Sequence, residues 1–153
     1  DEPSIAIYSG SGLNTVHDGK RTDNYATCAI VVRLVEELDK KMQAQERAIQ
    51  EIVAVPGRDG GTFRKRLKSR RLEQAMVAKT GTLFHTSALA GKISSKSHDS
   101  YFGMFHQLRG WKGNAKQVQN LMVSELMEDL GGSQRFEYKK MFFFPAVEPM
   151  RKK

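Results

Sequence analysis

The sequence predicts an α+β domain in which an antiparallel sheet is flanked by helices. Two observations predict it. The expected elements follow one another as a strand, helices, three consecutive strands and a last helix, an order typical of α+β folds. In addition, 39% of the 153 residues are apolar and 27% are charged, which is the composition of a folded globular chain rather than a disordered one.

The first part of the chain is predicted to contain a short strand, a loop and helices. Residues 5–8 form an apolar run that enters a Ser-Gly-Ser-Gly turn, and the polar residues 14–23 indicate a loop. Thr27 is the expected N-cap of a helix over residues 28–42, where apolar side chains recur at helical spacing. A shorter helical piece is expected over residues 46–53, stopped by the turn sequence "PGRDGG".

The second part is predicted to contain the sheet. A short basic helix over residues 62–67 precedes strands at 75–79, 87–93 and 101–108. An amphipathic helix over residues 115–130 follows, and Gly131-Gly132 ends it. Its predicted apolar stripe consists of Val118, Leu121, Met122, Leu126 and Leu130. Tyr101, Phe102 and Phe105 are expected in the sheet core, and the "MFFFPAV" run at 141–147 has no assigned role.

The charge of the chain favours anionic partners. The sequence has 25 Lys and Arg against 17 Asp and Glu, a net charge of +8, and residues 57–71 are the most basic segment. Nucleic acid, a membrane surface and an acidic polymer such as peptidoglycan are the possible partner classes. Because Phe63 is the segment's only aromatic residue and no nucleic-acid motif accompanies it, we interpret it first as a solvated basic face. Attraction to the anionic cell wall comes second, and no nucleic-acid binding is expected.

Several site types are not expected. Cys28 is the only cysteine, which excludes an intrachain disulfide, and it is predicted to be an inert packed thiol. The four histidines lack metal-ligand spacing, so neither a metal nor another cofactor is expected; His85 is interpreted as a surface residue. Ser87 is interpreted as a buried strand residue. No run reaches the roughly 20 apolar residues of a membrane span. No signal peptide is recognised, and the start at Asp1 suggests a processed, engineered or partial chain.

A short motif carries the functional signal. Residues 77–83 read "VAKTGTL", and Lys-Thr-Gly is one of three signatures shared by penicillin-binding proteins and class A β-lactamases. The triplet alone is weak, but the run "GRDGGTFRKRL…MVAKTGTLFHTSALAGKI" surrounds it, and "YSGSGLN" and "NYATCAIVVRLVEEL" precede it. In this order the blocks resemble the C-terminal part of penicillin-binding proteins of the PBP4 (DacB-like) type, which are D-alanyl-D-alanine carboxypeptidases and endopeptidases of the peptidase S13 family. The resemblance covers roughly residues 5–132. Ser9 in place of an Asp and a small insertion at residues 15–20 depart from the pattern.

The resemblance implies a fold, a location and partners. Residues 1–132 would be the C-terminal part of a transpeptidase-like domain of the penicillin-binding-protein and β-lactamase type, and residues 133–153 a C-terminal tail. The protein would be periplasmic or otherwise extracytoplasmic. It would act on peptidoglycan stem peptides, and β-lactams would inhibit it. Its remaining partner would be the missing N-terminal part of the same protein.

The resemblance also implies roles for the residues of the motif. Lys79 would place a positive charge at the mouth of the active site. Thr80 and Thr82 would donate hydroxyl hydrogen bonds to the D-Ala carboxylate, and the Thr82 backbone N–H would form half of the oxyanion hole. Gly81 would leave room for an extended peptide beside the strand. The competing interpretation is a strand that runs into a glycine turn.

The nucleophile itself is missing from the sequence. No Ser-x-x-Lys and no Ser-x-Asn occurs in the 153 residues. Thr22-Asp23-Asn24 resembles the second of these, but its position after the Gly-Ser-Gly turn favours a structural loop. We therefore expect the serine in a part of the protein outside this chain, which alone would be inactive. The alternative is a non-catalytic peptidoglycan-binding or interaction module of the same fold.

Overall fold

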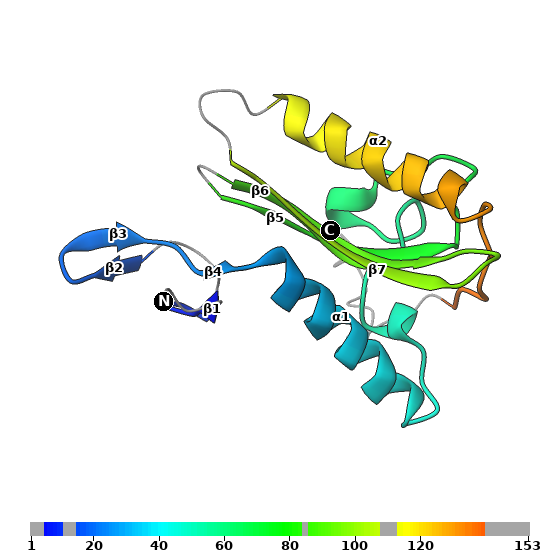
Figure 1. Ribbon diagram of the computed structural model, residues 1–153, viewed down its shortest axis with the longest axis horizontal. Coiled ribbons are helices and arrows are strands. Elements are labelled where there is room, and N and C mark those ends of the chain that lie inside the picture. Colours follow the sequence, from blue (N-terminus) through cyan, green and yellow to red (C-terminus); the bar gives the residue numbers. More distant parts are fainter. Residues whose placement is uncertain (1–4, 11–14, 84–85, 108–112, 140–153) are drawn as a thin grey trace, which may run out of the picture.

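A three-stranded antiparallel sheet lies between two helices (Figure 1). The computed structural model describes residues 5–10, 15–83, 86–107 and 113–139. The sheet has the order β5-β6-β7, and the predicted α+β fold is confirmed. Within the described residues no helix is long and apolar enough to cross a membrane. The elements of this body are α1 (Cys28–Gln43), β5 (Met76–Thr82), β6 (Thr86–Ser94), β7 (Asp99–Gln107) and α2 (Gly113–Asp129).

Helix α1 begins at the predicted N-cap. The Thr27 hydroxyl accepts a hydrogen bond from the backbone N–H of Ile30 (3.3 Å), which satisfies one of the free amides of the first turn. A buried ion pair holds the helix to the sheet, because the Lys92 ammonium on β6 lies 2.7 Å from the Asp39 carboxylate on α1. The hydroxyl of Tyr101 on β7 donates to the same carboxylate oxygen (2.8 Å). This polar network therefore fixes α1 against the central strand β6 and the neighbouring strand β7.

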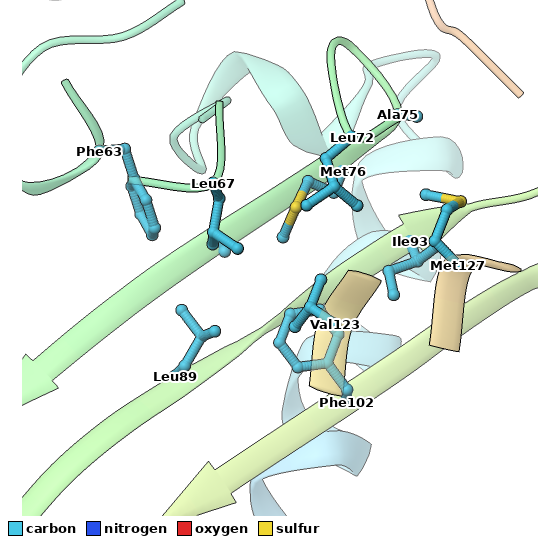
Figure 2. Close-up of a cluster of buried hydrophobic side chains, with 11 residues drawn as sticks. Phe63, Leu67, Leu72, Ala75, Met76, Leu89, Ile93, Phe102, Val123 and Met127 are labelled. Carbon is cyan, nitrogen blue, oxygen red and sulfur yellow. The ribbon is translucent and has the colours of Figure 1, made fainter. Parts of the chain in front are cut away.

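The core on the opposite face of the sheet lies beneath α2. Side chains alternate between the two faces along each strand. Figure 2 shows the α2-side cluster, in which Met76, Leu89 and Phe102 of the three strands face Val123 and Met127 of α2. Phe63, Leu67 and Leu72 of the segment before β5 complete it, as do Ala75, Ala78 and Ile93. A smaller core on the α1 side contains Ile49, Val55 and Val77.

The predicted apolar stripe of α2 is wrong at three of its five positions. Val118, Leu121 and Met122 are exposed, and only Leu126 and Leu130 pack against the core. The helix rests instead on its side chains at fourfold spacing, Ala115, Gln119, Val123 and Met127. Apolar spacing does not predict this face, because Gln119 is polar yet completely buried. Its amide oxygen accepts from Arg66 and its amide nitrogen donates to the Ser87 carbonyl. The helix ends as predicted, at Gly131 and Gly132 with positive φ.

The N-terminal segment contains two small antiparallel pairs, which project from the body beside the start of α1 (Figure 1). Strand β1 (Ile5–Ala6), shorter than predicted, pairs with β4 (Tyr25–Ala26). The predicted loop is wrong over its described part, because β2 (Thr15–His17) and β3 (Lys20–Thr22) form a hairpin. Asp18 and Gly19 both have positive φ, the conformation of a two-residue hairpin turn.

Two predicted helices are reduced to single 3₁₀ turns, Ile49–Glu51 and Gly61–Phe63. Glu46 and Leu67 adopt left-handed φ values of 56° and 58°, which an α-helix cannot contain. Cys28 is exposed, so its predicted packing is wrong. The beginning of the tail joins the sheet, since the Gln134 N–H donates to the Ser94 carbonyl (2.9 Å). The "MFFFPAV" run lies outside the described residues.

Candidate active site

The Lys-Thr-Gly triplet lies in the C-terminal half of β5, an edge strand of the three-stranded sheet. Strand β5 pairs with β6 on one side, and the triplet continues the pairing through Gly81↔Ala88 and Thr82↔Ser87. The alternative interpretation of a strand that ends in a glycine turn is therefore wrong. The strand is also longer than the predicted 75–79, because it continues to Thr82. All four site residues of the prediction, from Lys79 to Thr82, belong to one regular strand.

The backbone of β5 directs alternate peptide groups away from the sheet. The Ala78 N–H donates to the Ala54 carbonyl (2.9 Å), which lies outside the sheet. Because backbone groups alternate along a strand, the N–H and C=O groups of Thr80 and Thr82 face the same outer side. The described residues supply no backbone partner for either N–H on that side. This part of the edge can receive an extended peptide or an oxyanion.

The side chains of the triplet divide between the two faces of the sheet. Thr80 and Thr82 follow Met76 and Ala78 on the α2 side, whereas Lys79 is on the α1 side. The Lys79 ammonium is exposed and donates to the Thr80 carbonyl (2.6 Å) at the outer edge. The Thr80 hydroxyl donates to that of Thr62 (3.0 Å). A ligand on the edge would therefore meet an ammonium on one side and hydroxyl groups on the other.

Packing requires glycine at position 91 of the sheet but not at position 81. A Cβ on Gly91 of β6 would lie 2.0 Å from the Val77 carbonyl oxygen and 2.9 Å from the Ala78 Cα, so packing requires this glycine. A Cβ on Gly81 would meet only the Ala88 Cβ, at an ordinary 3.4 Å. The φ of Gly81 is not in the left-handed region. Nothing in the described fold therefore demands glycine at position 81.

A pocket of about 360 Å³, lined by hydroxyl, amide and cationic residues, opens beside Thr80 and Thr82. Its walls come from β5, from the segment before β5 and from α2, and its lining residues are Thr62, Lys65, Arg66, Thr80, Thr82, Lys116 and Asn120. These include three cations and no carboxylate. The buried side chains Phe63 and Leu67 hold the wall formed by the segment before β5 in place, because they anchor this segment in the core on either side of Lys65 and Arg66.

The Arg66 guanidinium is fixed within the wall of this pocket. The residue is only 9% exposed, and its guanidinium donates to the side-chain amide oxygens of Gln119 (Oε1, 2.6 Å) and Asn120 (Oδ1, 2.7 Å) on α2. Burial lowers the pKa of this guanidinium, although an arginine remains protonated in proteins. The interpretation of residues 57–71 as a solvated basic face is therefore wrong for Arg66. Lys65 and Arg64 beside it are exposed.

A known family matches most of the chain. Residues 3–126 match the model of the D-Ala-D-Ala carboxypeptidase 3 (S13) family. The chain belongs to this family. No curated protein sequence matches the chain significantly.

Solved structures resemble this S13 chain over most of its length. A predatory peptidoglycan endopeptidase from Bdellovibrio bacteriovorus is 26% identical with a TM-score of 0.83, covering 93% of the chain and 36% of its own length. A penicillin G-acylated predatory endopeptidase from the same organism, in complex with an immunity protein, is 25% identical with a TM-score of 0.80, covering 91% and 38%. Penicillin-binding protein 4 (dacB) from Haemophilus influenzae, complexed with a β-lactam, shares the fold at 24% identity and a TM-score of 0.54, covering 74% and 28%. The S13 chain thus spans little more than a third of the endopeptidases it matches.

Other residues considered in the sequence have structural positions in this S13 chain. Asn24 accepts hydrogen bonds from the backbone N–H groups of Tyr8 (2.7 Å) and Ser9 (3.0 Å), so its side chain supports the turn that follows β1. Ser87 is buried, which confirms the prediction. Of the aromatic residues expected in the core, Phe102 is buried but Phe105 is exposed. In the described part of the chain no cluster of three potential metal ligands occurs. His85 lies outside that part.

Sequence reasoning found the strand but missed the pocket beside it. Lys116, Gln119 and Asn120 were not recognised, because they lie on a helix whose sequence shows no site motif. Arg66 carried one local signal, since it stands between the apolar residues Phe63 and Leu67 in an otherwise basic run. That pattern indicates an anchored segment rather than a solvated one, but it does not show which residues of α2 approach it.

Proposed function

We propose that this chain is the substrate-binding part of a serine D,D-peptidase that hydrolyses D-Ala-containing peptidoglycan stem peptides and is acylated by β-lactams. The observation that carries the proposal is the Lys-Thr-Gly triplet in an edge strand whose outward backbone groups border a cationic, hydroxyl-lined pocket. Membership of the S13 family supports it. So does the penicillin G acylation of a related endopeptidase.

Each residue of the triplet has a role in the proposed reaction. A serine oxygen attacks the carbonyl of the penultimate residue, the terminal D-amino acid leaves with a proton on its amine, and water then hydrolyses the acyl-enzyme. The Thr82 N–H would stabilise the oxyanion, and Lys79 would supply positive charge near the attacking serine. The Thr80 and Thr82 hydroxyls would bind the free carboxylate of the substrate. Gly81 would admit the peptide backbone.

The serine is proposed to come from the part of the protein that this chain does not include. Apolar side chains on the helices are left for such a part to cover: Leu34 of α1 is 57% exposed and Leu121 of α2 is 60% exposed. On this proposal residues 1–132 are the C-terminal part of the transpeptidase-like domain and residues 133–153 are its tail. A peptidoglycan substrate places the enzyme outside the cytoplasm. Whether it acts mainly as a carboxypeptidase or as an endopeptidase depends on residues beyond the triplet.

The proposal is tested by acylation of the full-length protein that contains this chain. Labelled penicillin is added to the wild type and to Lys79→Ala, and adduct formation is followed by intact mass, with peptide mapping of the labelled serine. Lys79→Ala should slow acylation by at least about a hundredfold, the usual scale for an electrostatic group at the reacting atoms. Because Lys79 is exposed, its replacement should leave the thermal midpoint unchanged. Lys96→Ala, another exposed lysine close to a strand end, is the matched control and should react like the wild type.

Two results would contradict the proposal. Equal acylation rates for the wild type and Lys79→Ala would remove the role of Lys79. A label on a serine within residues 1–153 would show that the nucleophile lies in this chain. If the wild type does not react at all, the non-catalytic peptidoglycan-binding module becomes the better explanation.

A further inference from the structure

The pocket beside Thr80 and Thr82 contains positive charge that no described residue lining it neutralises. Lys65, Arg66 and Lys116 line it, and the other lining groups are neutral. Elsewhere in the same basic segment arginines have acidic partners: Arg58 pairs with Glu73 (2.9 Å), and Arg71 pairs with Glu128. Arg66 forms no ion pair with a described residue, although it is the most buried of these arginines. A buried charge without a counter-charge is costly, so an anionic ligand would stabilise this site.

The orientation of Arg66 leaves part of its guanidinium available. Nε donates to Asn120, and Nη2 donates to Gln119 and to the Lys116 backbone carbonyl (3.4 Å). These bonds use three of the five N–H donors, all of them with neutral acceptors. The two N–H groups of Nη1 have no hydrogen bond to a described residue. The guanidinium is thus held by α2 on one side and retains donors for a ligand.

Gln119 fixes that orientation from beneath. Its side chain is fully buried, and its Nε2 donates to the Ser87 carbonyl (3.0 Å) and lies 3.2 Å from the His106 Nδ1. Because these two acceptors on β6 and β7 orient the amide nitrogen, the amide oxygen must face Arg66. Gln119 is therefore a positioning residue, which connects the sheet and α2 to the pocket.

We infer that Arg66 is the charged ligand for the substrate's free α-carboxylate, acting together with the Thr80 and Thr82 hydroxyls. This inference rests on the proposed function and adds its specificity-determining residue. The pocket borders these hydroxyls, and a guanidinium can bind a carboxylate through two parallel N–H groups. The selected substrates are peptides in which the amino acid after the scissile bond has a free α-carboxylate. A C-terminal D-Ala meets this condition, and so does a cross-link whose acceptor centre is not amidated.

The test compares two peptides that differ only in a terminal D-Ala carboxylate or carboxamide. In the full-length protein, Arg66→Gln should lower kcat/KM for the carboxylate peptide by about tenfold to a hundredfold, the range for one lost charge-assisted hydrogen bond. Its kcat/KM for the carboxamide peptide should change less than about threefold, a loss of well under 1 kcal/mol. Arg66→Lys should restore part of the selectivity because it keeps the charge. Gln119→Leu should reduce the ratio in the same direction through a misplaced guanidinium. Arg64→Gln, exposed and outside the pocket lining, is the control and should leave the ratio unchanged.

The ratio of the two rates separates recognition from folding. If Arg66→Gln lowers both rates equally, its role is structural and the inference is wrong. If the wild type prefers the carboxylate peptide and Arg66→Gln keeps the same ratio of kcat/KM values for the two peptides, another group recognises the anion. The inference is then also wrong. If the wild type cleaves neither peptide and is not acylated by penicillin, the proposed function fails, and this inference fails with it.

Discussion

Replacing Gly81 of β5 and Gly91 of β6 separately by alanine should separate packing from substrate binding. In Gly91→Ala the new methyl group would lie 2.0 Å from the Val77 carbonyl oxygen. Since carbon atoms pack at about 3.5–4.0 Å and oxygen only slightly closer, β5 would have to move by more than about 1 Å. Backbone cannot yield as a flexible side chain does, so we expect a loss of about 1–3 kcal/mol or more. That corresponds to about 2–4 °C in Tm per kcal/mol for a domain of about 150–250 residues.

Gly81→Ala should have the opposite pattern. Its methyl group would meet only the Ala88 Cβ at 3.4 Å, so Tm should change by less than about 2 °C. On the exposed strand edge, however, the methyl group would hinder the approach of a peptide backbone, and kcat/KM should fall by about tenfold or more, equivalent to about 1.4 kcal/mol.

Both variants of the full-length protein would be measured by calorimetry and by penicillin acylation. Gly91→Ala should lose stability, and activity only as far as β5 is displaced. A Gly81→Ala protein with full activity would refute the steric role of Gly81. A Gly91→Ala protein with the wild-type Tm would refute the close packing of β5 on β6.

Three further predictions concern the carboxylate site and the polar network under α1. Thr80→Val should raise KM more for substrates with a free D-Ala carboxylate than for amidated ones, and equal effects on both would exclude carboxylate recognition by this hydroxyl. Asp39→Asn should lower the unfolding free energy by about 2–3 kcal/mol, the scale of a charged hydrogen bond. The reason is that Asp39 is buried and accepts a hydrogen bond from the Lys92 ammonium at 2.7 Å. Denaturant unfolding measures this loss, and an unchanged midpoint would contradict it. Stability should also fall as pH rises above 10. Burial and the hydrogen bond to Asp39 raise the pKa of Tyr101 above its usual 10.0. The pKa of Lys92 is also raised, because the hydrogen bonds to Asp39 and Asp99 outweigh burial, which lowers it. Above pH 10 the folded state therefore holds protons that the unfolded state releases, so this stabilisation is complete below pH 10 and is lost as the pH rises above it. Tyr101→Phe should flatten the decline in Tm between pH 10 and 12. An unchanged slope would exclude Tyr101 as the cause of the decline.

Local sequence rules were sufficient where one local interaction determines the structure. Thr27 caps α1 because its hydroxyl satisfies an amide three residues away. Gly131 and Gly132 end α2 because they tolerate positive φ. The three strands were found because apolar and β-branched runs between turn residues favour extended chain. The same rules failed at residues 62–67, where the left-handed φ of Leu67 stops a helix that the composition favours.

The phase of α2 could not be read from apolar spacing alone. Val118, Leu121 and Met122 formed the more apolar stripe, yet they face outward. The face that packs on the sheet includes Gln119, and this polar side chain is accepted in the core only because Ser87 and Arg66 satisfy its amide. These partners lie 32 and 53 residues away in sequence. No local pattern contains that information.

The sequence by itself determined the family, the order of α1, the three sheet strands and α2, and the strand that carries Lys79, Thr80, Gly81 and Thr82, because short motifs and turn residues are local in the chain. Only the tertiary structure decided which backbone groups of that strand face outward, that packing requires glycine at position 91 but not at position 81, and that Arg66 meets α2 beside the threonine hydroxyls. Strand pairing and helix packing bring together residues from positions 62 to 120, and the charge of the pocket arises from that assembly. A basic run is a property of the sequence, whereas a buried cation that no described carboxylate pairs with is a property of the fold.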